Sequence, residues 1–291
     1  MYMNDAIKYF SETDTWHADK KYYWPAAGTL NFFACSPVGV ATSCTPAGGV
    51  SIVDYTVDNI TDVLVADTVI GKTMNDKTGR TGVDMKMKHI VSMVDFKLAA
   101  DKDYSDPENG GFIIKLKSVT LNNIYTKGSF SQFSDGNSFV WSDQKNASSL
   151  KFTSRLDAKG GQQVPMGINY NKGEYFLNND SQYAASATQT PTMVLPQTIM
   201  VPAGAITDSA TMVVEYTIGQ VFEGDTLYGS VQLKDWETRT KAVKLSSVKI
   251  PDWKPNKKYV YTLILSFGEE ILFDPEVIEF DEPEITDEKQ F

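Results

Sequence analysis

The segment Trp253–Phe267 reads WKPNKKYVYTLILSF and leads from a turn directly into a long apolar run. Side chains of a β-strand alternate between its two faces. The face expected to be buried carries Tyr259, Tyr261, Leu263, Leu265 and Phe267. The opposite face, with Val260, Thr262 and Ile264, is also more apolar than a face in water requires. A strand covered on both sides predicts an all-β protein with packed sheets.

Short apolar runs of this kind recur along the whole chain. They are separated by Gly, Pro, Asn and Asp, which favour turns between strands. Almost no segment has the 3.6-residue period of an amphipathic helix. We therefore expect strands at 29–34, 50–57, 85–98, 112–124, 138–141, 193–201, 211–218, 230–233, 241–248 and 258–267.

Two of these predicted strands change phase partway along. In the run 112–124, the apolar positions Ile114 and Leu116 are followed by Val119 and Leu121, so one step is three residues long. A regular strand has a period of two, and the extra residue predicts a β-bulge. The run 85–98 also changes face, near residues 89–92.

Length and composition indicate a globular chain of two domains. The 291 residues are 42% hydrophobic and 22% charged, as in ordinary folded proteins. The net charge of -10 would repel a polyanion, so nucleic acid is not an expected partner. Residues 160–191 are rich in Gly, Asn, Gln, Ser and Ala, a composition typical of linkers and long loops. We therefore predict an N-terminal β-sandwich domain at 1–160 and a C-terminal one at 161–291, which ends in an acidic tail.

The sequence lacks the usual motifs of catalysis and cofactor binding. It has only two histidines, His17 and His89, and no nucleophile-elbow or zinc-protease motif. Lys72 stands in a Gly-Lys-Thr triplet, but Ala66 replaces the first glycine of a phosphate-binding loop. We predict no enzyme activity, catalytic residue, cofactor or metal site, and a packed structural role for His89. A pair of carboxylates, as in a secreted carbohydrate-active enzyme, stays open as an alternative.

The chain has two cysteines, Cys35 and Cys44, separated by small and turn-forming residues. A disulfide between them would close a short loop and stabilise the fold by about 2.5 kcal/mol. The alternative is a buried Cys35 thiol and a Cys44 thiol in a loop. The spacing leaves both open.

Several aromatic residues could form a platform on which sugar rings stack. Core packing accounts for the same residues, because buried Trp and Tyr often keep only a polar tip in water. The chain could therefore also be a monomeric surface module that binds a glycan or a protein. The residues in question are Tyr22, Tyr23, Trp24, Trp141, Trp236 and Trp253.

Four segments, in order, resemble the fimbrillin family, the type V pilins and Mfa-like surface proteins of Bacteroides-type bacteria. The first begins with Tyr22-Tyr23-Trp24-Pro25 and continues through 30–37, and the second is the histidine-bearing run 88–96. The third is Leu195-Pro196-Gln197, and the last is the opening segment 253–267. Together they cover most of the chain.

This resemblance implies two transthyretin-like Greek-key β-sandwich domains and no enzyme activity. It also implies export as a lipoprotein, a place on the outer membrane, and assembly into an extracellular pilus or fimbria that serves cell adhesion. The implied partners are other pilin subunits and a host protein or glycan, with the membrane contacted only through a lipid anchor absent from this chain. Family members assemble by donor-strand exchange. Because only residues 1–21 precede Tyr22, the N-terminal domain is expected to lack its first strand.

An apolar segment close to the acidic tail is a candidate donor strand. Full burial of four of its side chains would contribute about 6–12 kcal/mol before ordering costs. The alternative is that this segment completes the sheet of its own C-terminal domain. Its apolar residues are Ile271, Phe273, Val277, Ile278 and Phe280.

Overall fold

The computed structural model describes residues 3–58, 60–76, 82–100, 108, 112–133, 138–154, 174–175, 177–178, 192–198, 210–220, 237–245, 252–265 and 272–279. These residues form β-strands and turns and contain no α-helix, which confirms the all-β prediction. The strands are β1 (Ile7–Phe10), β2 (Thr15–Ala18), β3 (Leu30–Phe32), β4 (Cys35–Ser36), β5 (Ser43–Thr45), β6 (Gly49–Thr56), β7 (Leu64–Ala66), β8 (Val69–Lys72), β9 (Met87–His89), β10 (Ser92–Ala100), β11 (Phe112–Gln132), β12 (Phe139–Ser154), β13 (Glu174–Tyr175), β14 (Leu177–Asn178), β15 (Thr192–Val194), β16 (Gln197–Thr198), β17 (Thr211–Gln220), β18 (Glu237–Lys244), β19 (Asp252–Trp253), β20 (Lys257–Leu265) and β21 (Leu272–Glu279).

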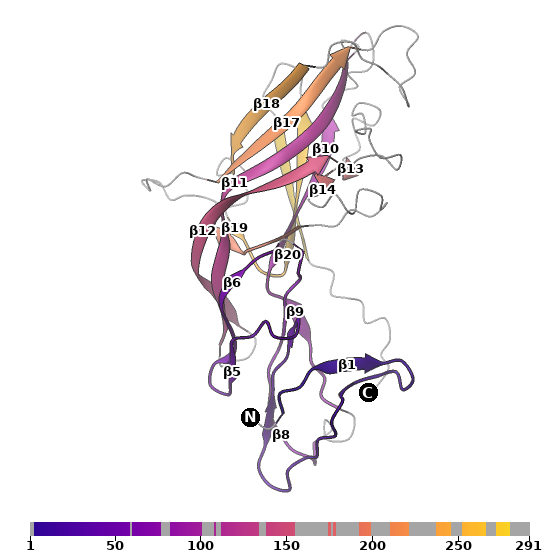
Figure 1. The fold of residues 1–291 in the computed structure, drawn as a ribbon, viewed down its shortest axis with the longest axis vertical. Coiled ribbons are helices and arrows are strands. Elements are labelled where there is room, and N and C mark those ends of the chain that lie inside the picture. The colour runs from indigo at the N-terminus through magenta and orange to yellow at the C-terminus, as the bar shows by residue number, and fades with distance from the viewer. Residues whose placement is uncertain are drawn as a thin grey trace.

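Two large sheets face each other in the upper part of the molecule (Figure 1). One has the order β14-β12-β11-β17-β18, and β6 joins it through β11 with β5 at its side. The other has the order β13-β10-β20-β21, with β15 also paired to β10. Most strand pairs are antiparallel, but β10 and β20 run parallel, from Met93 opposite Lys258 to Ala100 opposite Leu265.

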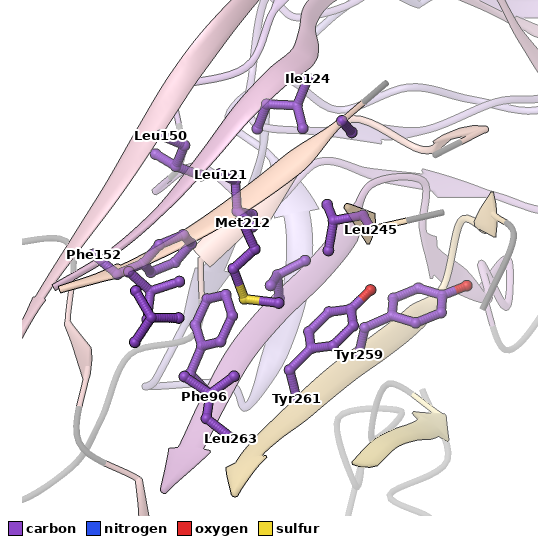
Figure 2. Packing of buried hydrophobic residues seen from close by; sticks show 14 of the residues in the cluster. Phe96, Leu121, Ile124, Leu150, Phe152, Met212, Leu245, Tyr259, Tyr261 and Leu263 are labelled. Carbon is purple, nitrogen blue, oxygen red and sulfur yellow. The ribbon is translucent and has the colours of Figure 1, made fainter. Parts of the chain in front are cut away.

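The larger hydrophobic core lies between these two sheets. Figure 2 shows Phe96, Tyr261 and Leu263 on one side of it, facing Phe152 and Met212 on the other. The Phe96 ring meets the Phe152 ring edge-on, with 4.7 Å between centroids, and stacks on Tyr261 at 5.8 Å. The burial expected from the two-residue period of the opening segment is confirmed at Tyr259, Tyr261 and Leu263. Phe267 lies outside the described residues, and the burial of Leu265 stays a prediction. The members of this cluster are Val94, Phe96, Val119, Leu121, Ile124, Leu150, Phe152, Val194, Ala210, Met212, Val214, Tyr216, Ile218, Leu245, Trp253, Tyr259, Tyr261 and Leu263.

A smaller core lies below the larger one in the view of Figure 1, where β5, β6 and β9 are found. It draws on the sheet β4-β7-β9 and on the β5-β6 part of the large sheet, whereas β3 and β8 form a separate pair. The long strand β11 reaches both cores, because Ile124 belongs to the larger cluster and Phe130 to the smaller one. The buried members of the smaller cluster are Val50, Ile52, Val57, Val63, Val65, Ile90, Val91, Phe130 and Met193.

The predicted bulge in β11 is confirmed. The pairing of β11 with β17 shifts register between Leu116 and Ser118, and Val119 and Leu121 are buried beyond the shift. A second shift in the pairing with β12 lies between Leu121 and Ile124, where Asn123 has a positive φ of 57°. Asn adopts this left-handed conformation at lower cost than most residues, so it suits a bulge.

Two predicted strands are each divided in the structure. The run 85–98 forms β9 and β10, which belong to different sheets, and the division falls at Ile90 and Val91, close to the predicted change of face. The run 193–201 forms β15 and β16, because Pro196 cannot donate a hydrogen bond to a sheet ladder. The predicted strand 230–233 lies outside the described residues.

The predicted domain boundary between 160 and 161 also lies outside the described residues and stays a prediction. The division into two transthyretin-like Greek-key domains stays a prediction as well. The larger cluster draws on both sides of that boundary, for example Phe152 before it and Met212 after it.

Candidate functional site

The candidate donor segment forms the edge strand β21. It pairs antiparallel with β20 of the same chain, from Leu272 opposite Ile264 to Glu279 opposite Lys257. In the described part of the chain, β20 is its only strand partner, so β21 ends the sheet. Phe273, Val277 and Ile278 lie within it, whereas Ile271 and Phe280 lie outside the described residues.

The register places the apolar residues of β21 at different points along β20. Phe273 pairs with Leu263, Val277 with Tyr259, and Ile278 with Lys258. The Val277 side chain is 49% exposed at this edge of the sheet.

β20, in contrast, is fixed in the core by buried side chains. Tyr259, Tyr261 and Leu263 are almost completely buried. The Trp253 Nε1–H donates to the Tyr261 hydroxyl at 2.9 Å, and the backbone N–H of Lys254 donates to the Tyr259 hydroxyl at 2.6 Å. Burial raises the pKa of Tyr261, so this hydroxyl keeps its proton at neutral pH.

Two buried glutamines complete the sheets where regular pairing stops. At the β11 bulge, the Gln197 Oε1 accepts from the N–H of Tyr125 at 2.7 Å. Its Nε2 donates to the carbonyls of Tyr125 and Leu195, both at 3.0 Å. At the end of β11, Gln132 accepts from the N–H of Val50 at 3.1 Å and donates to the carbonyl of Ala66 at 2.9 Å. Each side chain makes hydrogen bonds to backbone groups that a neighbouring strand would otherwise make.

His89 has the structural role that the sequence predicts. It is buried at the end of β9, and its Nδ1 lies 2.6 Å from the Asp62 carboxylate. The neighbouring Lys88 forms an ion pair with Asp67 at 2.5 Å. These pairs hold β9 against the turns that flank β7.

Cys35 and Cys44 are free thiols in the structure, on β4 and β5. Each is half-buried and packs against the smaller core. Burial raises the pKa of both thiols, and for Cys44 the nearby Cys35 raises it further. Both are therefore protonated, weakly nucleophilic thiols at neutral pH.

Most of the candidate platform aromatics have other roles. Trp253 is buried in the larger core, and Trp141 packs on the smaller core and donates to the carbonyl of Ile90 at 2.6 Å. Trp24 packs edge-on against Phe32. Tyr22 and Tyr23 are exposed, the latter by 75%, and Trp236 lies outside the described residues.

Another exposed aromatic pair, which the sequence patterns above do not indicate, lies on the hairpin formed by β1 and β2 in the lower part of Figure 1. Tyr9 and Trp16 are direct cross-strand partners with ring centroids 5.6 Å apart, and they are 48% and 60% exposed. Ile7 lies on the same face and is 43% exposed. The sequence feature that could have indicated this hairpin is the mixture of aromatic and polar residues on both sides of a short turn.

The described residues show no cluster of three or more side chains able to hold a metal ion. Among these same residues, no helix is both long and apolar enough to cross a bilayer.

The packed sheets and the edge strand β21 define an all-β protein. A crystal structure of a fimbrial protein from Bacteroides vulgatus has a similar fold, with a TM-score of 0.63 and 15% identity over 96% of this chain and 85% of that one. The sequence matches the fimbrillin-like family model over residues 2–287, and the chain therefore belongs to the fimbrillin-like family.

Two further structures are similar at lower scores. A candidate cell adhesion protein from Bacteroides uniformis has a TM-score of 0.43 and 15% identity, over 93% of this chain and 81% of that one. Another from Bacteroides ovatus has a TM-score of 0.45 and 13% identity, over 92% and 76%. No protein of curated function matches the sequence.

Proposed function

We propose that this chain is a non-enzymatic, structural or adhesive subunit of a cell-surface pilus, and that it joins its neighbours by donating β21. Its place would be extracellular, on a fimbria held at the outer membrane by a lipid anchor, and its partners other pilin subunits. The observation that carries the proposal is the position of β21 at the end of its sheet. Membership of the fimbrillin-like family supports the same function.

The pairing of β21 with β20 is suited to exchange between chains. The ladder runs from Lys257 opposite Glu279 to Ile264 opposite Leu272, and it is made by the backbone. A copy of the same strand from a second subunit would restore every one of these pairs. The free energies of the closed monomer and the exchanged pair therefore differ mainly in the cost of association.

The acceptor side keeps its shape when β21 leaves. Tyr259 and Tyr261 are held by hydrogen bonds that come from the Trp253 and Lys254 side of the strand, not from β21. Removal of β21 would expose a straight row of backbone groups on β20. Such an edge favours the addition of another strand.

Introduced cysteines can distinguish a donated β21 from one retained in its own chain. Thr262 and Asp274 are direct partners across β20 and β21. One tagged chain carries Thr262→Cys and a second carries Asp274→Cys, both with Cys35→Ser and Cys44→Ser. When the two are co-expressed, purified as assemblies and oxidised, donation predicts a covalent heterodimer on a non-reducing gel.

The matched control replaces Asp274→Cys by Glu279→Cys. Glu279 lies opposite Lys257, five positions from Thr262 and so about 17 Å away along the strand, too far for a disulfide. Donation would be ruled out if purified filaments gave no heterodimer while the double variant Thr262→Cys/Asp274→Cys closed an internal disulfide.

The Tyr9 and Trp16 pair favours a second candidate function, glycan binding by an exposed aromatic platform. The two rings are tilted by 49° and lie on one face of a hairpin. The Tyr9 hydroxyl donates to Asp14 at 2.7 Å, which places a carboxylate beside the rings. Aromatic faces flanked by polar groups suit sugar rings, whose C–H groups stack while their hydroxyls bond at the edge.

For this function, Trp16→Ala should reduce glycan-array binding by at least tenfold. The expected loss corresponds to about 1.4 kcal/mol or more of stacking. Tyr23→Ala is the matched control, because Tyr23 is the most exposed of the described tyrosines, and it should leave binding unchanged. Equal glycan binding by the wild type and Trp16→Ala would show that the hairpin is not the glycan-binding site.

A further inference from the structure

The two cysteines lie on strands of different sheets that meet over the smaller core. Cys35 in β4 is opposite Val65 of β7, in the sheet β4-β7-β9. Cys44 in β5 is opposite Val50 of β6, in the sheet that contains β11. A covalent bond between them would therefore connect two sheets and not two neighbouring strands.

A closed turn and one contact with β6 shape the loop between the cysteines. The N–H of Val40 donates to the carbonyl of Pro37 at 3.3 Å, which closes the turn. The N–H of Thr42 donates to the carbonyl of Ser51 on β6 at 2.8 Å, just before β5 begins at Ser43.

Both thiols pack on the same group of side chains. Cys35, Val40, Ala41 and Cys44 are all partly buried against the smaller cluster. Burial against this cluster raises the pKa of both thiols, and Cys35 raises that of Cys44 further, which agrees with their shared position.

We propose that Cys35 and Cys44 form an intramolecular disulfide that ties β4 to β5 and closes the smaller core. The oxidant is a low-molecular-weight disulfide such as oxidised glutathione. The thiolate of one cysteine attacks it and releases one reduced glutathione, which leaves a mixed disulfide on the protein. The second thiolate attacks the protein sulfur of that mixed disulfide and releases the other glutathione. Two thiols lose two protons and two electrons, and one glutathione disulfide gains them.

The test treats the folded full-length chain with oxidised glutathione, blocks remaining thiols with N-ethylmaleimide, and measures the intact mass. We expect neither maleimide nor glutathione on the monomer, and a proteolytic peptide that contains both cysteines in disulfide linkage. The oxidised protein should melt about 5–10 °C above the reduced protein, because the bond constrains the unfolded chain.

Single cysteine variants show whether the second thiol displaces glutathione from the mixed disulfide formed by the first. Cys35→Ser and Cys44→Ser should each retain one glutathione as a stable mixed disulfide, because the resolving sulfur is missing. The proposal is overturned if the folded wild type keeps glutathione or reacts with two maleimides, or if the disulfide forms only in denaturant. Disulfide-linked dimers of the wild type would also overturn it.

Discussion

Tyr261→Ala should lower the free energy of unfolding by about 3–5 kcal/mol, the usual cost of deleting a large buried aromatic side chain. The Tyr261 side chain is completely buried, its ring stacks on Phe96, and its hydroxyl oxygen accepts a hydrogen bond from the Trp253 Nε1–H. Its removal leaves both a cavity and an unpaired indole N–H. Chemical denaturation with an unchanged m-value measures the loss directly.

Two further variants separate packing from hydrogen bonding. Tyr261→Phe keeps the ring and removes only the acceptor of Trp253, so it should cost about 1–3 kcal/mol. Tyr23→Ala, at a position that is 75% exposed, should change stability by no more than about 0.5 kcal/mol. If Tyr261→Ala were as mild as this control, β20 could not be the centre of the larger core.

The second large effect is expected for Gln197→Met, which keeps the length of the side chain but removes its polar atoms. The Gln197 amide satisfies the N–H and carbonyl of Tyr125 and the carbonyl of Leu195. Buried backbone groups left without a partner are costly, and we expect a loss of about 2–4 kcal/mol. Amide hydrogen exchange should also show a faster rate at the Tyr125 N–H.

Gln144→Met is the matched control for this glutamine. The Gln144 side chain makes one hydrogen bond, to the carbonyl of Pro196 at 2.5 Å, in the same part of the structure. Its loss should cost only about 1 kcal/mol. Similar losses for the two variants would show that Gln197 does not replace a strand neighbour at the bulge.

The sequence predicts best those strands whose side chains are buried. The period of two in 257–265 and the phase change after Leu116 depend on which residues must leave water, and both are confirmed. Most of β12, from residue 142 onward, is not indicated by the sequence pattern. Residues 142–149 are almost entirely polar, and they are extended because they pair with β11, an interaction that leaves no apolar pattern.

The candidate site was only partly predictable for a similar reason. The apolar residues near the acidic tail mark a strand, but only the structure reveals that its partner is β20 of the same chain. The bridging role of Gln197 depends on a bulge seventy-two positions earlier in the chain, so no local pattern could indicate it. Exposed Trp16 was overlooked because a short hairpin without a core gives a weak strand signal.

The continuity of β11 through both cores determines how the molecule would respond to a pulling force. A load applied along the length of β11 and β12 meets antiparallel hydrogen bonds that lie across the direction of pull. These bonds would then be loaded in shear, many at once, instead of opening one after another. The parts of the molecule around the two cores would therefore resist tension together.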